Sequence, residues 1–300
     1  MNEQIFANPH VSVSRIFAVI VLYRHSISQS STCTSLLGQS DSAGNRLICL
    51  VYDNSPEPAS ETPPSGWTYF SDTHNGGLSK AYNYAFTLAK EQGCDWLLLL
   101  DQDSILPPNF LVTLFSVIDG VQNSLDIAAI VPRVFSSARQ ISPVRPHPGR
   151  EVSIHLYNSV ASGWVSAINS AACIRTDFVA SIGGFAKEFW LDYLDYWLFL
   201  KLYRCGKQVF ISEARVQHEL SVASFERSMS YERYQNVLAA EMHFTNQYLG
   251  PVWQLALVAR LLMRTAKHLI LGHDKRFAWA AFRAFCTQLV SLFPTIEALT

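Results

Sequence analysis

The stretch DWLLLLDQDS, residues 95–104, joins an uninterrupted apolar run directly to a cluster of acids and amides. Trp96 to Leu100 contains no polar residue, which is typical of a strand buried on both faces of a parallel sheet. Asp101, Gln102 and Asp103 follow at once. Because open α/β sheets bind ligands at the carboxyl ends of their strands, this junction predicts a buried strand with a ligand site at its end.

Three further segments repeat the pattern of an apolar run followed by polar or turn residues. They are residues 16–22, 46–52 and 127–131. Between two of these predicted strands, Ser79 to Gln92 carries apolar side chains at helical spacing. Buried strands that alternate with amphipathic helices predict an α/β fold with a mostly parallel central sheet.

Length and composition exclude several classes of protein. The chain has 300 residues, 49% of them hydrophobic and 16% charged, with a net charge of −1, so it buries a sizeable core and is not mainly disordered. The near-neutral charge argues against nucleic acid as a partner. The six cysteines form no CxxC pair, which predicts reduced, mostly buried thiols. With no basic leader and no apolar run of the roughly 18 residues that a span needs, we expect a cytoplasmic protein.

Polar side chains also follow the first two predicted strands. Tyr23 and Arg24 come after the first strand, and Asp53 and Asn54 come after the second. Residues 75–80, NGGLSK, form a glycine-containing turn whose backbone amides open the predicted helix and can receive a phosphate. Ordinary turn chemistry explains any one of these clusters, but their repetition at successive strand ends favours a nucleotide site.

Asp101 and Asp103 stand two positions apart. On an extended segment such residues project to the same side, so both carboxylates can face one cation. Oxygen ligands of this kind suit Mg²⁺ or Mn²⁺, which keep several waters and bridge to a diphosphate.

These segments together resemble the family 2 glycosyltransferases of GT-A fold, and within them the rhamnosyltransferase-like branch of bacterial surface polysaccharide synthesis. The matching segments are residues 19–24, 52–55, 75–83, 95–104, 183–185, 191–195, 206–207 and 217–220. The resemblance covers about residues 14–240, and it implies a Rossmann-like, mostly parallel sheet flanked by helices.

The resemblance also implies roles on the donor side. Nucleotide-sugar contacts fall on Tyr23, Arg24, Asp53, Asn54, Asn75, Lys80, Asp101 and Gln102. Divalent Mn²⁺ or Mg²⁺ is expected at Asp101, Asp103 and His218. Without the resemblance, the sequence around His218 favours a structural histidine.

The acceptor side is less sharply defined. The resemblance points to Asp195 as the catalytic base, with nearby Asp192 as the alternative. Trp197 stands where the family commonly has a second acid, and Gln235-Asn236 stand where it often has arginine before asparagine. Gly163, Trp164 and Trp190 are further candidates for acceptor or sugar contacts. The aromatic residues around Asp195 suit either a sugar-stacking wall or a packed core.

The composition changes near residue 249, which predicts a catalytic domain over residues 1–248 and a helical extension over 249–300. Between Pro251 and Phe285 six Lys and Arg residues oppose one acid, Asp274. Arg260, Arg264, Lys267 and His268 fall within one arc of a helix beside a broad apolar face, which is typical of a helix lying in a membrane interface. A cap on the catalytic domain or a homo-oligomer contact explains the same pattern.

We therefore expect an inverting, metal-dependent glycosyltransferase at the inner face of the cytoplasmic membrane. Its expected donor is dTDP-rhamnose, with a UDP-sugar as the other possibility, and its expected acceptor is a hydroxyl of a lipid-linked oligosaccharide in O-antigen or other surface polysaccharide synthesis. The alternative is a non-catalytic nucleotide-sugar or glycan-binding assembly protein that retains the fold. Its support in the sequence is the absence of the second acid at Trp197.

Overall fold

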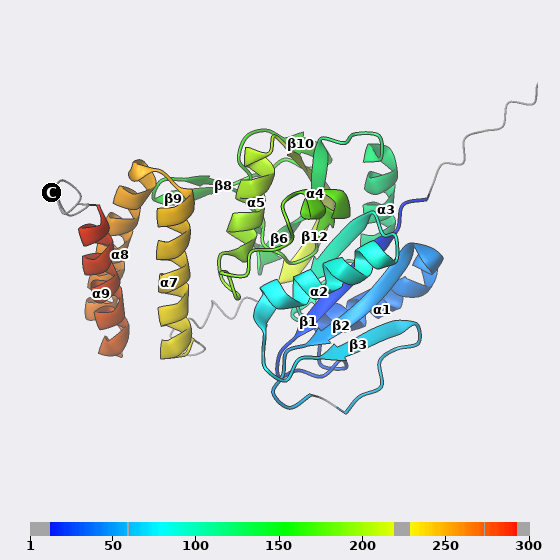
Figure 1. Ribbon diagram of the computed structural model, residues 1–300, viewed down its shortest axis with the longest axis horizontal. Coiled ribbons are helices and arrows are strands. Elements are labelled where there is room, and N and C mark those ends of the chain that lie inside the picture. The colour runs from blue at the N-terminus through cyan, green and yellow to red at the C-terminus, as the bar shows by residue number, and fades with distance from the viewer. Residues whose placement is uncertain (1–12, 59, 219–228, 273, 293–300) are drawn as a thin grey trace, which may run out of the picture.

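A computed structural model describes residues 13–58, 60–218, 229–272 and 274–292 (Figure 1). A large mixed sheet forms its centre, with strand order β10-β12-β6-β11-β4-β1-β2-β3, to which β5 is added beside β12 and β7 beside β6. Its strands are β1 (Ile16–Leu22), β2 (Leu47–Asp53), β3 (Trp67–Ser71), β4 (Trp96–Leu100), β5 (Ser104–Ile105), β6 (Ile127–Ser136), β7 (Arg139–Ser142), β10 (Ser159–Ala161), β11 (Ala172–Arg175) and β12 (Gln208–His218). A separate hairpin pairs β8 (Val144–His147) with β9 (Arg150–Ser153).

The sheet has the predicted, mostly parallel character. β1 pairs in parallel with both β2 and β4, and β2 pairs in parallel with β3. β11 runs antiparallel between β4 and β6. The apolar runs are buried on both faces, since alternate residues of β1 enter different clusters of the core: Phe17 and Val19 one, Ala18 and Ile20 the other.

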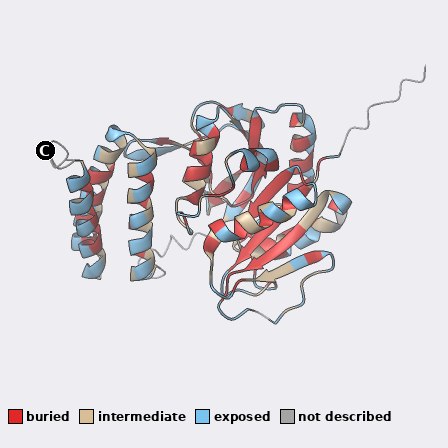
Figure 2. Cartoon of the chain, in the orientation of Figure 1, coloured by how far each residue is buried: buried red, intermediate tan, exposed pale blue. Residues whose placement is uncertain are grey.

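Helices cover the two faces of the sheet (Figures 1 and 2). The helices are α1 (Ser31–Ala43), α2 (Gly77–Glu91), α3 (Phe110–Val121), α4 (Thr176–Ser181), α5 (Leu194–Arg204), α7 (Tyr231–Tyr248), α8 (Pro251–Leu271) and α9 (Lys275–Ser291), with a 3₁₀ turn, η1 (Gly44–Arg46). α1 and α3 pack on one face, and α2, α4 and α5 pack on the other. This arrangement confirms the predicted α/β class.

The element boundaries differ from the sequence expectation in several places. The helix expected from Ser79 already begins at Gly77, the strand expected over 46–52 runs from Leu47 to Asp53, and the strand expected to end at Val131 continues to Ser136. β3 was not predicted, because its residues 67–71 follow a proline-rich loop and contain no uninterrupted apolar run. Since β3 pairs with β2, it adds one more strand end beside the predicted nucleotide site.

The helices α7, α8 and α9 stand side by side at one end of the molecule, next to α5 and the β8–β9 hairpin (Figure 1). They share a small core of their own, which comprises Tyr234, Leu238, Leu257, Leu261, Ala280 and Ala284. The other end of α7 packs into the main core through Phe244. The helix α7 therefore joins the catalytic fold to the extension. The boundary at residue 248 stays a prediction.

The sequence predicted an exposed basic stripe on α8, formed by Arg260, Arg264, Lys267 and His268. This prediction is wrong, because most of these side chains do not face solvent. Arg260 and Arg264 turn inward to the buried carboxylate of Glu241 on α7, and His268 is buried as well. Of the four residues expected in the stripe, Lys267 is the exposed one. The helical period placed these residues on one arc, but it did not show that the arc faces an acid on another helix. Among the described residues, no helix is both long and apolar enough to span a bilayer.

Candidate functional site

Three predicted metal ligands come together at the carboxyl edge of the sheet. Asp101 and Asp103 follow β4, and His218 is the last residue of β12, which pairs with β5 immediately beyond the two acids. One ligand atom from each of the three residues lies within 4.8 Å of those of the others. His218 Nδ1 is 3.5 Å from a carboxylate oxygen of each aspartate. Glu219 and Leu220, which complete the predicted motif, lie outside the described residues.

Neighbouring side chains hold this group in place. Both oxygens of Asp101 accept hydrogen bonds from serines, Oδ1 from Ser104 at 2.7 Å and Oδ2 from Ser170. Ser104 Oγ also lies 3.1 Å from His218 Nδ1. Such outer hydrogen bonds orient metal ligands and fix the histidine ring. Ser104 is part of the predicted motif, whereas the contact of Ser170 with Asp101 could not be read from the sequence.

The electrostatics of the group suit a divalent cation. Burial and the nearby charge of Asp101 raise the pKa of Asp103 to about 6, although His218 works in the opposite direction. Two carboxylates that crowd each other in this way are relieved by a bound cation. Carboxylate oxygens suit Mg²⁺ and Mn²⁺, and the additional imidazole ligand fits Mn²⁺ better than Mg²⁺. The three residues therefore fit the predicted cofactor.

Gln102, between the two acids, ties the end of β4 to the end of β1. Its Oε1 accepts a hydrogen bond from the backbone amide of Tyr23 at 2.7 Å, and its Nε2 lies 3.1 Å from His25 Nδ1. Tyr23 is 38% exposed, and the Arg24 guanidinium stacks 5.1 Å from the centre of its ring. The predicted residues Tyr23, Arg24 and Gln102 are thus neighbours around one loop.

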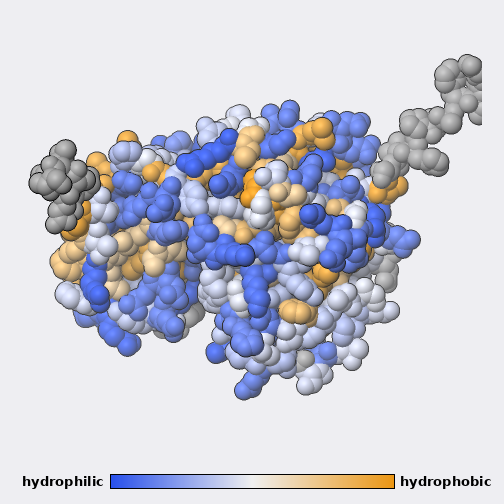
Figure 3. Space-filling view, in the orientation of Figure 1, coloured by the Kyte–Doolittle hydropathy of each residue, from blue (hydrophilic) through white to orange (hydrophobic). Residues whose placement is uncertain are grey.

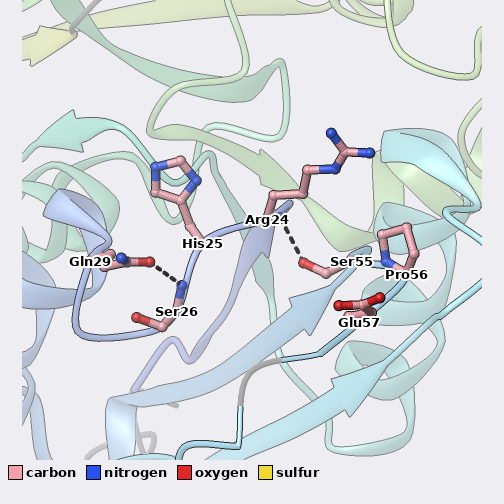
Figure 4. A pocket seen from close by; sticks show the side chains of 7 residues that line it. All are labelled: Arg24, His25, Ser26, Gln29, Ser55, Pro56 and Glu57. Carbon is pink, nitrogen blue, oxygen red and sulfur yellow. Dashed lines mark hydrogen bonds between the residues drawn. The ribbon is translucent and has the colours of Figure 1, made fainter.

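A hollow of about 450 Å³ opens beside this loop, at the ends of β1 and β2 (Figure 4). Its lining residues are Arg24, His25, Ser26, Gln29, Ser55, Pro56 and Glu57. The Arg24 backbone amide donates to Ser55 Oγ at 2.7 Å, which fixes one loop against the other. The hollow lies where the strand-end residues predicted a nucleotide.

Asp53 and Asn54 lie below this surface. Asp53 is fully buried, and its carboxylate accepts hydrogen bonds from the Ser55 amide at 2.8 Å and the Tyr69 hydroxyl at 2.6 Å. Asn54 is also buried, and its Oδ1 has no hydrogen-bond partner among the described residues. These contacts give Asp53 a structural function at the ends of β2 and β3. Its contact with a nucleotide stays a prediction.

The turn before α2 brings two predicted residues into contact. Trp190 donates from Nε1 to the backbone carbonyl of Asn75 at 2.9 Å, and its own carbonyl accepts from the Leu78 amide at 2.8 Å. Gly77 has a φ of +78°, and a Cβ there would lie 2.3 Å from the Trp190 carbonyl oxygen. The glycine is therefore required for this close approach. Trp190 remains 40% exposed, next to the start of α2.

Lys80 does not stand alone at this helix start. Its Nζ lies 2.8 Å from the carboxylate of Asp72, a buried residue that immediately follows β3. Asp72 also accepts from the Tyr52 hydroxyl at 2.9 Å and the Gly76 amide at 3.1 Å. Burial acts to raise the pKa of Asp72, but Lys80, Tyr52 and Gly76 outweigh it, and the pKa is lowered.

Sequence reasoning missed Asp72. The segment 67–71 directly before it, rich in aromatic residues, would have signalled a strand end. Lys80 also borders a second hollow of about 510 Å³, together with Ser79, Asn83 and Lys187.

Asp192 and Asp195 have different surroundings. Asp192 forms an ion pair with Arg233 of α7, with Oδ1 and Nη2 2.8 Å apart. Asp195 lies in the first turn of α5, and the desolvation caused by the surrounding protein raises the pKa of its carboxyl group to about 7. The charges of Asp192 and Glu151 add to this increase, and the Tyr196 backbone amide opposes it. A carboxyl group that titrates near neutral pH suits a general base.

The predicted acceptor residues fall in separate places. Trp164 packs against Trp253 of α8, with ring centres 5.2 Å apart. A narrow pocket is lined by both tryptophans, and by Glu151, Tyr196 and Arg260 among others. Gly163 is exposed at a φ of +74°, and Trp190 lies beside Asn75 at the turn before α2. The three residues therefore do not form one contiguous surface.

Some of the aromatic residues around Asp195 pack in the core, and others are placed where they could stack on a sugar. Phe189 and Trp197 are buried in the main core. Tyr196 is partly exposed, and its hydroxyl donates a hydrogen bond to Glu151. Trp190, Tyr193 and Tyr196 are thus the aromatic side chains here that remain accessible to a sugar.

Comparison with known proteins agrees with this architecture. The sequence model described as Glycosyl transferase family 2 matches residues 31–173. No curated protein sequence matches the chain.

Three solved structures illustrate the likeness in fold. GalNAc-T7 with UDP, GalNAc and Mn²⁺ has a TM-score of 0.59 at 12% identity; the match covers 94% of this chain but 57% of GalNAc-T7. TarS 1–349 from S. aureus in complex with UDP-GlcNAc has a TM-score of 0.55 at 13% identity, over 93% of this chain and 82% of that one. The mannosyltransferase PcManGT from Pyrobaculum calidifontis, in complex with GDP-Man and Mn²⁺, has a TM-score of 0.52 at 14% identity, and the match covers 95% of this chain and 77% of PcManGT. Residues 31–173 therefore resemble Glycosyl transferase family 2, and the chain adopts the GT-A fold.

Proposed function

We propose that the protein transfers a sugar from a nucleotide-sugar donor to an acceptor hydroxyl, with inversion at the anomeric carbon. The observation that carries the proposal is the group formed by Asp101, Asp103 and His218, whose ligand atoms lie within 4.8 Å of one another at the carboxyl edge of the sheet. Divalent Mn²⁺ or Mg²⁺ held there would offset the negative charge that develops on the departing diphosphate.

The donor occupies the surface around the loop after β1 in this proposal. Tyr23, Arg24 and the hollow lined by Ser55 and Glu57 receive the nucleoside. The start of α2, with Asn75 and Lys80, lies on the phosphate side in this proposal, where the positive end of the helix dipole favours an anion and Asp72 holds the Lys80 ammonium in place. Asp53 and Asn54 support this surface from below.

Asp195 is the proposed base. It takes the proton of the acceptor hydroxyl while that oxygen forms a bond with the anomeric carbon. The bond between this carbon and the diphosphate oxygen breaks, and the nucleoside diphosphate leaves with the electron pair. A pKa of about 7 lets the carboxylate accept a proton near neutral pH. Asp192, already paired with Arg233, positions the segment that carries Asp195.

The proposed donor is dTDP-rhamnose, with a UDP-sugar as the second choice, and the proposed acceptor is a lipid-linked oligosaccharide. Support for a nucleotide-linked sugar comes from the relatives, since TarS is described with UDP-GlcNAc and PcManGT with GDP-Man. Support for rhamnose is limited to the resemblance of the sequence motifs. The acceptor approaches through the pocket formed by Trp164, Trp253 and Tyr196, next to the base.

A thermal-shift screen tests the proposal. Nucleotide sugars with uracil, thymine and guanine bases are added to the full chain with Mn²⁺ or with EDTA. Since a ligand that binds the folded state raises the free energy of unfolding by RT ln(1 + [L]/Kd), the donor should increase Tm with Mn²⁺ and much less with EDTA. The matched control is Asp103→Asn, which should lose the Mn²⁺-dependent part. Equal shifts with Mn²⁺ and EDTA, or no shift with any nucleotide sugar, would contradict the proposal.

A further inference from the structure

The unit formed by α7, α8 and α9 buries polar side chains beside its small apolar core. Glu241 of α7 is fully buried and forms ion pairs with two arginines of α8, Arg260 at 2.8 Å and Arg264. Between α7 and α9, Gln288 of α9 is buried and exchanges two hydrogen bonds with Asn246, at 2.7 and 3.1 Å. Side chains that ordinarily face water are here enclosed between the helices.

The exterior of the same unit is apolar. Its outer face is defined by exposed side chains of α8 and α9, namely Val252, Leu255, Leu262, Met263, Leu269, Ile270, Trp279, Phe282, Leu289 and Val290. Met263 and Ile270 are 64% and 78% exposed. Figure 3 shows apolar surface gathered over this end of the molecule, beside the C-terminus. An exposed apolar area that runs along two helices marks an interaction surface.

The internal ion pairs keep this face outside. A rotation of α8 that hid its aliphatic side chains would pull Arg260 and Arg264 away from Glu241. That would leave a carboxylate buried without its partners, which is strongly unfavourable. The cluster of Glu241, Arg260 and Arg264 therefore fixes the orientation of the helix.

We infer that the outer face rests on an anionic lipid surface. Lys267 and Arg283 are exposed on the same two helices, and Asp274, the single acid between Pro251 and Ser291, is paired with Arg276 at 2.8 Å. Anionic headgroups complement this charge. A second copy joined by a two-fold axis would instead bring together two faces that both carry a net positive charge. Trp279 suits the boundary between headgroups and acyl chains, where an amphipathic helix lies parallel to the surface.

This placement brings the catalytic segment close to the lipid surface. α7 contacts that segment twice, through the ion pair of Arg233 with Asp192 and through Phe244, whose ring centre lies 5.6 Å from that of Tyr193. Trp253 and Arg260 of α8 line the pocket that also contains Tyr196. A lipid-borne acceptor would therefore meet the site without leaving the membrane.

Vesicle flotation with the full chain tests the inference. The vesicles contain phosphatidylglycerol or phosphatidylcholine alone, with neither donor nor acceptor, so the result does not depend on the proposed transfer reaction. The wild-type protein should float with phosphatidylglycerol and much less with phosphatidylcholine. Met263→Glu/Ile270→Glu should weaken binding at least about tenfold, because it places charge in the apolar layer. Lys267→Glu and Arg283→Glu should each weaken binding to phosphatidylglycerol about fivefold or more.

The matched control is Val112→Glu/Leu125→Glu, which adds the same charge at exposed apolar residues of the catalytic fold. It should float as the wild type does, and circular dichroism should show that all variants are folded. The inference is overturned if the wild type does not float, or if Met263→Glu/Ile270→Glu floats unchanged. It is also overturned if the wild type forms a dimer that this variant abolishes while neither protein binds vesicles.

Discussion

Arg233 of α7 forms an ion pair with Asp192, with Nη2 and Oδ1 2.8 Å apart. Asp195, three residues further on, forms no ion pair with any of the described residues. The two acids of one short segment are therefore chemically different. Asp192 has its charge balanced by a guanidinium, while desolvation raises the pKa of Asp195 to about 7. A carboxylate that is already paired is a poor proton acceptor, so the geometry favours Asp195 as the base.

Replacement of Asp192 tests this division. Asp192→Asn should lower kcat about tenfold or less and leave the donor KM almost unchanged, because it loosens the segment without removing the base. Arg233→Met breaks the same pair and should have a similar effect. The double variant should cost no more than either single variant, since all three lack the same interaction. If Asp192→Asn removed transfer as completely as Asp195→Asn, Asp192 would be the base.

His218 should contribute directly to metal affinity. His218→Gln removes the imidazole that lies 3.5 Å from both aspartates, so Mn²⁺ affinity measured by calorimetry should fall at least about tenfold. His74→Gln is the matched control, because the side chain of His74 is 91% exposed and lies beside Asp72. Unchanged Mn²⁺ affinity in His218→Gln would place the metal elsewhere.

Asp72 should contribute mainly to stability. Asp72→Asn weakens its contacts with Lys80, Tyr52 and the Gly76 amide, so the free energy of unfolding in urea at pH 7 should fall by about 1–3 kcal/mol. Because the pKa of Asp72 is lowered in the folded protein, this contribution is present above the unfolded pKa. It is lost as the pH falls through the folded pKa, so the difference from wild type should shrink in acid.

The control for Asp72 is Asp119→Asn, which breaks a more exposed pair with Arg46 and should cost less than about 1 kcal/mol. Equal costs for the two variants would contradict the structural function of Asp72.

The strands and the metal group illustrate what the sequence predicts well. The apolar runs of β1, β2 and β4 are long enough to be recognised locally, and Asp101 and Asp103 follow one of them directly. His218 was found through a family resemblance, since it reaches the acids only because β12 pairs with β5.

The orientation of α8 illustrates what the sequence does not predict. Periodicity identified its two faces, but which face is buried depends on Glu241, a residue of another helix. The contact of Ser170 with Asp101 was missed for a similar reason, because it joins residues 69 positions apart in the chain.

The raised pKa of Asp195 has a consequence for stability. The pKa rises from 3.8 to about 7 on folding, so between these values the folded protein binds more protons than the unfolded chain. The free energy of unfolding therefore falls as the pH rises through this window, and the loss is complete above pH 7. Asp195→Asn removes the penalty, so its Tm should exceed that of wild type by more at pH 8 than at pH 5. The same difference at both values would show that Asp195 is not desolvated.

Transfer by Asp195→Asn is the most direct measurement of the proposed mechanism. Release of nucleoside diphosphate is followed with Mn²⁺, the donor identified by thermal shift and a lipid-linked oligosaccharide extract. Wild type should release the diphosphate only when acceptor and Mn²⁺ are both present. Asp195→Asn should bind the donor as wild type does but lose at least about 100-fold in kcat, because general base catalysis is removed. Turnover by Asp195→Asn at the wild-type rate would contradict the proposed mechanism.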